Sequence, residues 1–376
     1  MNRILFVNLE GVIGGAETSL LVMVKHLHRR FLISVACPGE SPLSRSLDAI
    51  QVDSYKLPRP LRRAHLSLFS LRYWLKASYC LIRIALQTHP DVIHANSFYA
   101  APVSILAALV AGKRVLSHAR DLTNFGFFSK FCSWFCEKVI AVSHTVETAL
   151  IDQGVNPDKI EVVYNGVDNV FFDQSGTNGM LFGPPGHDGK NSFVFAHIAQ
   201  FVPWKNHIAF LEAASHVACD LPNARFVLVG DDIFGRDSNY KSSLLSYAKN
   251  STIAKRVSFL GWQENMHEVW PKIDCLVHTA EREPFGRVII EAMANKIPVI
   301  AVDSCGPSEI IQDGKTGILV QAGDIKGLSE AMLRIARDTQ FAARVANAGY
   351  EHSVSSFIAD KTAALIEKIY GEVLAK

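Results

Sequence analysis

The chain has little net charge and no paired cysteine motif. Its 38 basic and 36 acidic residues leave a formal net charge of +2, which is too small to favour nucleic-acid binding through bulk electrostatics. Seven cysteines are scattered without a Cys-x-x-Cys pair, and the four-residue spacing of Cys132 and Cys136 suits one helix face better than a zinc knuckle. We therefore expect a reduced, cytoplasmic protein that does not bind nucleic acid.

Several catalytic motifs are also missing. No Gly-x-Gly-x-x-Gly follows a strand pattern, and the chain contains no Walker A motif, no Gly-x-Ser-x-Gly and no Asp-x-Asp. These absences argue against a nicotinamide dehydrogenase, a phosphate-loop ATPase, a serine hydrolase of the nucleophile-elbow type and a metal-dependent sugar transferase. No histidine spacing indicates a metal site, so we expect no metal and no cofactor.

Long apolar segments are scarce. Residues 1–17 contain no extended apolar region and no small-residue cleavage site, so we expect a first strand there and not a signal peptide. Residues 95–112 carry no formal charge, but they include Asn96, Ser97, Pro102 and Ser104. We expect a buried helix that follows a strand, in preference to a membrane span.

Alternating strand and helix patterns fill most of the chain. Hydrophobic residues make up 49% of the 376 residues, which predicts two folded domains. Short β-branched runs followed by helical patterns predict parallel strands with crossover helices, hence an α/β fold of two doubly wound, Rossmann-like halves. A segment rich in Gly, Pro, Asn and Asp separates them, so we expect domains at 1–173 and 191–355 with a linker at 174–190. Ligands of such sheets bind at the carboxyl ends of the strands, which predicts a site in a cleft between the halves.

Two carboxylates, Glu283 and Glu291, stand eight positions apart in EREPFGRVIIEAMA, residues 281–294. We expect a helix to begin near Phe285, where the backbone N–H groups of Gly286 and Arg287 favour an anion such as a phosphate. Glu291 then lies about 7–8 Å further along the helix, at the depth of an attached ribose. Spacing alone leaves another interpretation open: Glu291 is an ordinary surface residue, and Glu283 complements the helix dipole.

The segment EPFGRVIIEAMANKIPVIAVD resembles the signature of family 4 of the retaining glycosyltransferases, which have the GT-B fold. Further segments match that family in order along nearly the whole chain: GGAE at 14–17, YNGVD at 164–168, FVPWKNH at 201–207, FLGW at 259–262, CGPSEII at 305–311 and DGKTGILV at 313–320. The C-terminal half carries the more specific matches.

The resemblance implies roles for individual residues. Glu291 would bind the ribose, Glu283 would contact the donor sugar, and Lys205 would neutralise the diphosphate as the glycosidic bond breaks. Gly14 and Gly15 would let a loop of the first domain approach the donor. The last helix, about residues 356–376, would complete the first domain.

Three further positions follow from the resemblance. His118, in SHARD, would contact the sugar or the acceptor, although a histidine at a strand end is often structural. Glu309 would lie near the nucleotide. Gln200 stands where the family usually has an arginine, and it lacks the bidentate cationic fork; we expect Lys205 and the helix start at Phe285–Arg287 to hold the diphosphate without it.

The implied activity is metal-independent transfer of a sugar from a nucleoside diphosphate to an acceptor hydroxyl, with retention at the anomeric carbon. We find no convincing nucleophile for a double displacement, so we expect the departing phosphate to take the acceptor's proton. The acceptor is expected to be a lipid-linked glycan of bacterial surface polysaccharide assembly. A soluble small acceptor, a non-catalytic GT-B partner subunit and a sugar-nucleotide epimerase on the same fold remain as alternatives.

Residues 59–88 are rich in basic and apolar side chains. Arg72, Lys76 and Arg83 form one stripe of a predicted helix, while Leu68, Leu71, Leu75 and Ile82 lie on another face; Arg59, Arg62 and Arg63 precede it. Such a helix would rest on the cytoplasmic face of an anionic membrane and meet a lipid-linked acceptor. The alternative is an ordinary amphipathic helix that packs on its own domain.

Overall fold

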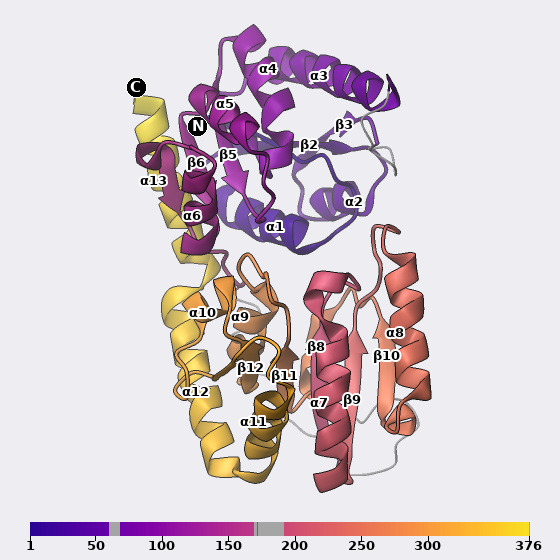
Figure 1. Ribbon diagram of the computed structural model, residues 1–376. Coiled ribbons are helices and arrows are strands. Elements are labelled where there is room, and N and C mark those ends of the chain that lie inside the picture. The colour runs from indigo at the N-terminus through magenta and orange to yellow at the C-terminus, as the bar shows by residue number, and fades with distance from the viewer. Residues whose placement is uncertain (60–67, 169–170, 172–191, 376) are drawn as a thin grey trace. The chain divides into compact units, whose positions relative to one another are not determined.

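A computed structural model describes residues 1–59, 68–168, 171 and 192–375 (Figure 1). The chain divides into two compact units, residues 1–166 with 359–376 and residues 167–358. The predicted linker at 174–190, together with Arg62, Arg63 and the side chain of Leu68, lies outside the described residues.

The first unit is built on a parallel seven-stranded sheet in the order β3-β2-β1-β4-β5-β6-β7. Its strands are β1 (Arg3–Val7), β2 (Leu32–Pro38), β3 (Asp53–Leu57), β4 (Val92–Ala95), β5 (Arg114–Ala119), β6 (Lys138–Ala141) and β7 (Ile160–Val162). Its α-helices are α1 (Gly15–Leu27), α2 (Pro42–Ala49), α3 (Leu68–Thr88), α4 (Ala101–Ala111), α5 (Phe127–Phe135), α6 (His144–Asp152) and α13 (Ala359–Ala375).

The second unit has a parallel six-stranded sheet in the order β10-β9-β8-β11-β12-β13. Its strands are β8 (Phe193–Ile198), β9 (Ala224–Val229), β10 (Val257–Gly261), β11 (Cys275–His278), β12 (Val299–Val302) and β13 (Ile318–Val320). Its α-helices are α7 (His207–Asp220), α8 (Ser238–Asn250), α9 (Arg287–Ala294), α10 (Cys305–Ile310), α11 (Ile325–Arg337) and α12 (Thr339–Ser356).

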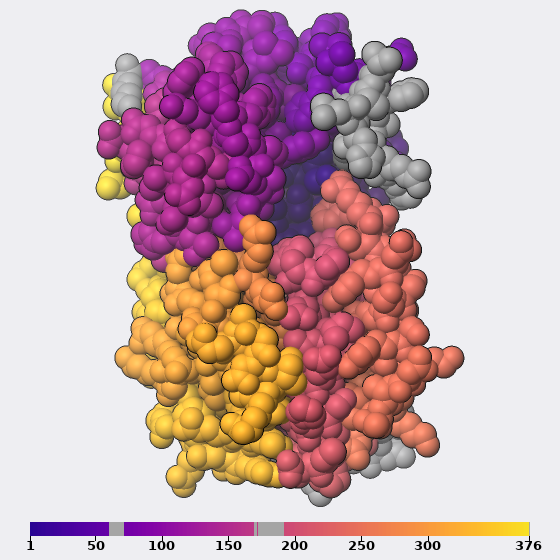
Figure 2. Space-filling model, viewed as in Figure 1, coloured from indigo at the N-terminus to yellow at the C-terminus, as the bar shows by residue number. Residues whose placement is uncertain are grey.

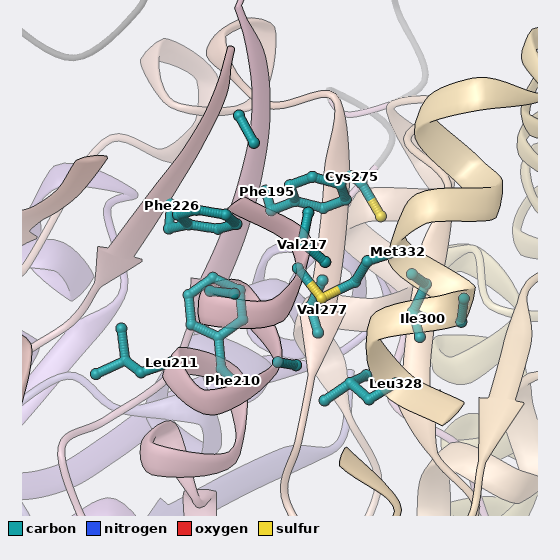
Figure 3. Packing of buried hydrophobic residues seen from close by; sticks show 14 of the residues in the cluster. Phe195, Phe210, Leu211, Val217, Phe226, Cys275, Val277, Ile300, Leu328 and Met332 are labelled. Atoms are coloured by element: carbon teal, nitrogen blue, oxygen red, sulfur yellow. The ribbon is translucent and has the colours of Figure 1, made fainter. Parts of the chain in front are cut away.

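Continuous apolar runs explain the central strands, because helices cover both faces of each sheet. Figure 3 shows this packing in the second unit, where Phe210 of α7 and Met332 of α11 meet strand residues such as Phe226 and Val277. In the first unit, α13 packs on α1 and buries Tyr370 among the residues of the sheet. The doubly wound α/β prediction is therefore confirmed for both halves.

Both strand orders reverse direction at one point, between β1 and β4 and between β8 and β11. In the first unit Val7 pairs with Ala95, and in the second Ala196 pairs with Leu276. Ligands of doubly wound sheets bind beside the carboxyl ends of the strands at this reversal. The loops after these strands are therefore the places to look for a site in each unit.

Some elements differ from the sequence prediction. Strand β3 was not predicted, because DSYKL is a polar edge strand without an apolar run. The helix expected within 95–112 is shorter, Ala101–Ala111, and it is not buried all round, since Leu106, Leu109 and Val110 are exposed. Within the described part of the chain, none of the helices combines the length and apolarity that crossing a bilayer requires.

Candidate functional site

Three loops of the second unit carry the residues predicted for the donor. Gln200 and Lys205 follow β8, Glu283 to Gly286 follow β11, and Glu309 lies in α10, which follows β12. These strands are neighbours or next neighbours in the sheet, so their carboxyl ends share one edge. The sheet topology thus gathers residues that are up to about a hundred positions apart in the sequence.

Lys205 and Glu283 form a buried ion pair at this edge. Lys205 Nζ donates to Glu283 Oε2, and His278 Nε2 donates to the same oxygen at 3.2 Å. Burial alone would raise the pKa of Glu283, but the charge of Lys205 and the His278 hydrogen bond outweigh it and lower the pKa to about 2. Burial lowers the pKa of His278. At neutral pH the group therefore consists of a lysine cation, a carboxylate and a neutral imidazole.

Backbone contacts fix the loop that carries Lys205. Thr279 Oγ1 donates to the carbonyl of Asn206 at 2.8 Å and lies 2.8 Å from His197 Nε2. His197 Nε2 is also 3.2 Å from the carbonyl of Lys205. The Lys205 ammonium stacks over the Trp204 ring, 4.1 Å from its centroid, a cation–π contact. The position of Lys205 is thus set by several groups besides Glu283.

Helix α9 begins where the sequence indicated. Its first residue is Arg287, and Gly286 is the N-cap, with φ of 107° and no side-chain cap. Most other residues are strained at such a φ. Gly306 of α10 packs against the backbone of Phe285, where an added Cβ would lie 2.4 Å from Phe285 Cα. The Gly306 N–H also donates to the Glu283 carbonyl at 2.9 Å, so two glycines shape this helix start.

Glu291 lies four residues beyond Arg287, on the first turns of α9. Arg287 Nη2 donates to Glu291 Oε1 at 2.8 Å, and the two side chains are only 11% and 12% exposed. Burial raises the pKa of Glu291, while Arg287 opposes the shift. The surface-residue interpretation of Glu291 is therefore wrong. Its Oε2 makes no hydrogen bond to the residues that the structure describes.

Two further predicted donor residues, Gln200 and Glu309, lie outside both ion pairs. Gln200 is half-buried in the loop after β8, and its side chain has no hydrogen bond within the described ranges. Glu309 is half-buried in α10. Neither lies in the Lys205–Glu283 or the Arg287–Glu291 pair.

The matching edge of the first unit holds a network of amides around one arginine. Arg120 Nε donates to Asn96 Oδ1 at 3.0 Å, and Arg120 Nη1 donates to Asn165 Oδ1 at 2.8 Å. Asn96 Nδ2 donates to Asn8 Oδ1 at 2.9 Å, and Asn8 Nδ2 donates to Glu17 Oε1 at 3.2 Å. The network thus joins the loops after β1, β4, β5 and β7.

The glycine loop and His118 are attached to this network. Gly14, the N-cap of α1, donates its N–H to Glu17 Oε2 at 3.0 Å, and Gly15 is exposed as the first residue of that helix. Arg120 Nη2 donates to His118 Nδ1 at 3.2 Å. Burial, with Arg120 and His94, lowers the pKa of His118 well below its usual range. His118 is therefore a neutral imidazole whose proton is on Nε2.

Some partners in the site could be predicted from sequence and others could not. Lys205, Glu283, Arg287 and Glu291 were predicted, and the structure joins them in two pairs. His278, which donates to Glu283, and the amide network around Arg120 were not predicted. The hydrogen bonds of the network join segments far apart in the sequence. A usable signal existed for the network: Asn8, Asn96 and Arg120 are polar residues at the carboxyl ends of apolar strand segments.

Comparisons with known proteins assign both halves of the chain to a family. Residues 13–170 match the family described as Glycosyltransferase Family 4, and residues 185–352 match Glycosyl transferases group 1. N-acetyl-alpha-D-glucosaminyl L-malate synthase of Bacillus anthracis is 29% identical over 78% of either chain. UDP-Gal:alpha-D-GlcNAc-diphosphoundecaprenol alpha-1,3-galactosyltransferase of Escherichia coli is 25% identical over 83% of this chain and 81% of the relative.

The fold has solved counterparts. The crystal structure of Anabaena HepE in complex with UDP-glucose superposes with a TM-score of 0.85 and 24% identity, covering 99% of this chain and 100% of that one. Two family matches span most of the chain, the named relatives are glycosyltransferases, and both halves are doubly wound. The chain therefore belongs to the family 4 glycosyltransferases and is a glycosyltransferase with the GT-B fold.

Proposed function

We propose that the chain transfers a sugar, with retention at the anomeric carbon, from a nucleoside diphosphate donor to a hydroxyl of a lipid-linked glycan. The evidence for donor binding is the carboxyl edge of the second sheet. The Lys205–Glu283 pair, the uncapped start of α9 and Glu291 follow one another there. HepE of Anabaena, solved in complex with UDP-glucose, supports this class of donor.

The donor fits this edge in three steps. The diphosphate lies at the start of α9, where the helix dipole and the backbone N–H groups at Gly286 favour an anion. The ribose diol donates to Glu291, whose Oε2 is not used by Arg287. The sugar lies beside Glu283, and the Lys205 ammonium moves its hydrogen bonds from Glu283 to the phosphate. His278 keeps its hydrogen bond to Glu283, which favours the ionised carboxylate that accepts from sugar hydroxyls.

The chemical step uses no protein nucleophile in this proposal. The phosphate oxygen that leaves the anomeric carbon takes the proton of the acceptor hydroxyl, and the hydroxyl oxygen bonds to that carbon from the same face. Lys205 and the α9 amides stabilise the charge that collects on the departing diphosphate. His118, as a neutral Nε2–H imidazole, is suited to donate to a hydroxyl and not to carry a charge. No metal is required in this scheme, because Lys205 supplies the cation.

Helix α3 favours a membrane-borne acceptor over a soluble one. Leu71 and Leu75 are 56% and 61% exposed, so they do not pack on their own domain. They form a stripe beside exposed Arg72, Lys76 and Arg83, and the buried face of α3 consists of other residues, such as Ala77 and Leu81. An exposed apolar stripe beside a basic one suits an anionic membrane surface. The E. coli relative, whose name specifies a diphosphoundecaprenol acceptor, supports this choice, and the malate synthase supports the soluble alternative.

Binding of the donor tests the proposal directly. We expect UDP or GDP, and the corresponding sugar nucleotides, to raise the melting temperature of the full chain, since a ligand at a hundred times its Kd contributes about 2.7 kcal/mol to stability. Slow release of free sugar from the bound donor, followed by NMR of the anomeric proton, would report the stereochemistry. Absence of any shift with all common nucleoside diphosphates would refute the donor assignment.

A further inference from the structure

An aromatic pocket in the first unit has no role in the donor chemistry. It has a volume of about 270 Å³ and is lined by Trp74, Phe98, Tyr99, Pro102, Phe125 and Phe128. These residues come from α3, the short helix Phe98–Ala100, α4, the loop before α5, and α5 itself. The pocket is smaller than the usual range of about 300–1,000 Å³ for drug-sized ligands, so it suits part of a chain and not a whole sugar nucleotide.

The walls of the pocket are fixed by their own ring contacts. Phe98 stacks on Phe125 with ring centroids 6.0 Å apart, and Trp74 meets Tyr99 edge-on at 5.0 Å. Phe98 is buried, and α3 packs along α4, as Figure 1 shows. Four of the six lining residues offer only hydrocarbon side-chain surface. Sugar hydroxyls need polar partners, so the lining favours an apolar chain.

The surface around the pocket is apolar as well. Of the 21 large hydrophobic side chains that are exposed in the described structure, 13 lie between Leu71 and Phe135. On α5, Phe127 is 71% exposed and Trp134 is 56% exposed. In Figure 2, violet and purple atoms from this part of the chain cover much of the visible surface of the first unit. Exposed apolar surface of this kind marks a protein or membrane contact.

Charge distinguishes between these two contacts. Helices α3, α4 and α5 contain four basic residues, Arg72, Lys76, Arg83 and Lys130, and no acidic residue. A basic, aromatic-rich apolar face complements an anionic bilayer, whose interface accommodates Trp and Phe side chains. A second copy of this chain would instead bring the same positive charges together. The observations therefore favour a lipid as the occupant.

The pocket is close in sequence to the polar network of the first unit. Phe98 follows the network residue Asn96 by two positions, at the carboxyl end of β4. Phe125 follows Arg120 by five positions, in the loop after β5. An occupant with a polar head and an apolar tail would meet the network with one end and the pocket with the other.

We propose that the pocket binds the hydrocarbon chain of the membrane-borne acceptor, next to its phosphate-bearing head. This inference rests on the proposed function and defines its acceptor: a long-chain lipid phosphate or diphosphate that carries the glycan. The chain enters from the bilayer on which α3 and α5 lie. The pocket thereby selects for the lipid portion of the acceptor.

Alkyl phosphates test the pocket without knowledge of the natural acceptor. We would measure binding of hexyl, octyl, decyl and dodecyl phosphate to the full chain by calorimetry, below their micelle concentrations, with inorganic phosphate as the chain-free probe. We expect affinity to rise about fourfold for each buried methylene and to level off once the pocket is full. Saturating UDP should leave this binding unchanged.

Matched variants locate the binding. Phe128→Gln, at a lining residue that is 47% exposed, should weaken dodecyl phosphate binding at least tenfold and flatten the dependence on chain length. Phe135→Gln, on the same helix and 41% exposed but outside the pocket, should bind as the wild type does. Equal effects of the two variants, or no dependence on chain length, would overturn the proposal. So would displacement by UDP, or a dimer in sedimentation that Phe128→Gln dissolves.

The same measurements distinguish failure of the lipid pocket from failure of the proposed glycosyl transfer. UDP-induced stabilisation together with a flat alkyl series would reject the lipid pocket and leave the glycosyl transfer standing. Failure of every nucleoside diphosphate to bind would instead reject the donor assignment, whatever the alkyl phosphates do.

Discussion

The carboxyl edges of the two sheets have the same topology but different chemistry. In the second unit, the edge is charged: Lys205 pairs with Glu283, and Arg287 pairs with Glu291. In the first unit, one arginine is surrounded by amide oxygens, and His118 is neutral. The doubly wound fold thus fixes where a site lies, while the side chains decide what kind of group it handles.

The difference fits the two halves of a sugar transfer. A diphosphate gains negative charge as it leaves, so its site needs cations and helix amides that are already oriented. In the proposed function the acceptor hydroxyl is neutral until it reacts, so a neutral edge would suffice on its side. Substitutions in the second unit should therefore change the donor chemistry steeply, and those in the first unit should spare the donor.

The largest effect is expected for Lys205→Met. Loss of this cation should lower kcat roughly 10²–10³-fold, the usual cost of removing one preorganised electrostatic group. It should also destabilise the fold by about 3 kcal/mol, because Glu283 is left buried without its partner. The double variant Lys205→Met/Glu283→Gln is the control: it should recover stability but not turnover. Near-normal turnover in Lys205→Met would disprove the charged-edge interpretation.

The stability of the fold at acid pH should depend on Glu283, the carboxylate of that pair. The pKa of Glu283 falls from 4.5 to about 2 in the folded state, so its contribution is complete above pH 4.5 and is lost as the pH falls through 2. The shift corresponds to about 3 kcal/mol. Glu283→Gln should therefore be less stable than the wild type at pH 7, and the gap should close by about pH 2. A gap that is independent of pH in denaturant titrations would contradict the assignment.

Arg120→Lys tests the neutral edge. Lysine cannot reach Asn96, Asn165 and His118 at the same time with a forked head group. We expect a loss of about 2 kcal/mol, near 1 kcal/mol for each of two lost hydrogen bonds. UDP affinity should remain within twofold of the wild type, because these residues belong to the first unit. A large loss of donor affinity would contradict the assignment of donor binding to the second unit alone.

The fold and much of the charged edge could be predicted from sequence. Continuous apolar strands such as RILFV and the Phe-Gly turn before α9 have strong local signals, and Glu283, Glu291 and Lys205 stand in recognisable segments. The ion pairing of Lys205 with Glu283 could not be predicted, because it depends on how two loops 78 positions apart meet. The exposure of Leu71 and Leu75 could not be predicted either, because an amphipathic pattern does not show which apolar side chains are buried.

Glu291→Gln sharpens the contrast within the charged edge. Burial raises the pKa of Glu291, so its ionised form costs stability above that pKa, in the opposite sense to Glu283. The glutamine variant should be as stable as the wild type at pH 7, within about 1 kcal/mol, and should bind UDP about tenfold more weakly for lack of a charged acceptor. Glu330→Gln, from an exposed pair with Lys326 on α11, should change neither property. Clear destabilisation of Glu291→Gln would show that Arg287 needs the carboxylate.

The smallest effect is expected for Gln200→Arg, which adds the cation that the family's segment usually has at this position. If Lys205 and the start of α9 already hold the diphosphate, a half-buried guanidinium in the loop after β8 adds less than about 1 kcal/mol. The KM for the donor should fall by no more than about threefold, and kcat should not change. A hundredfold gain in kcat/KM would show that the native charged edge lacks a cation. The loop after β8 would then contribute more to diphosphate binding than the start of α9. Gln200→Glu controls for loop damage, because it keeps the side chain's size and should weaken donor binding through repulsion alone.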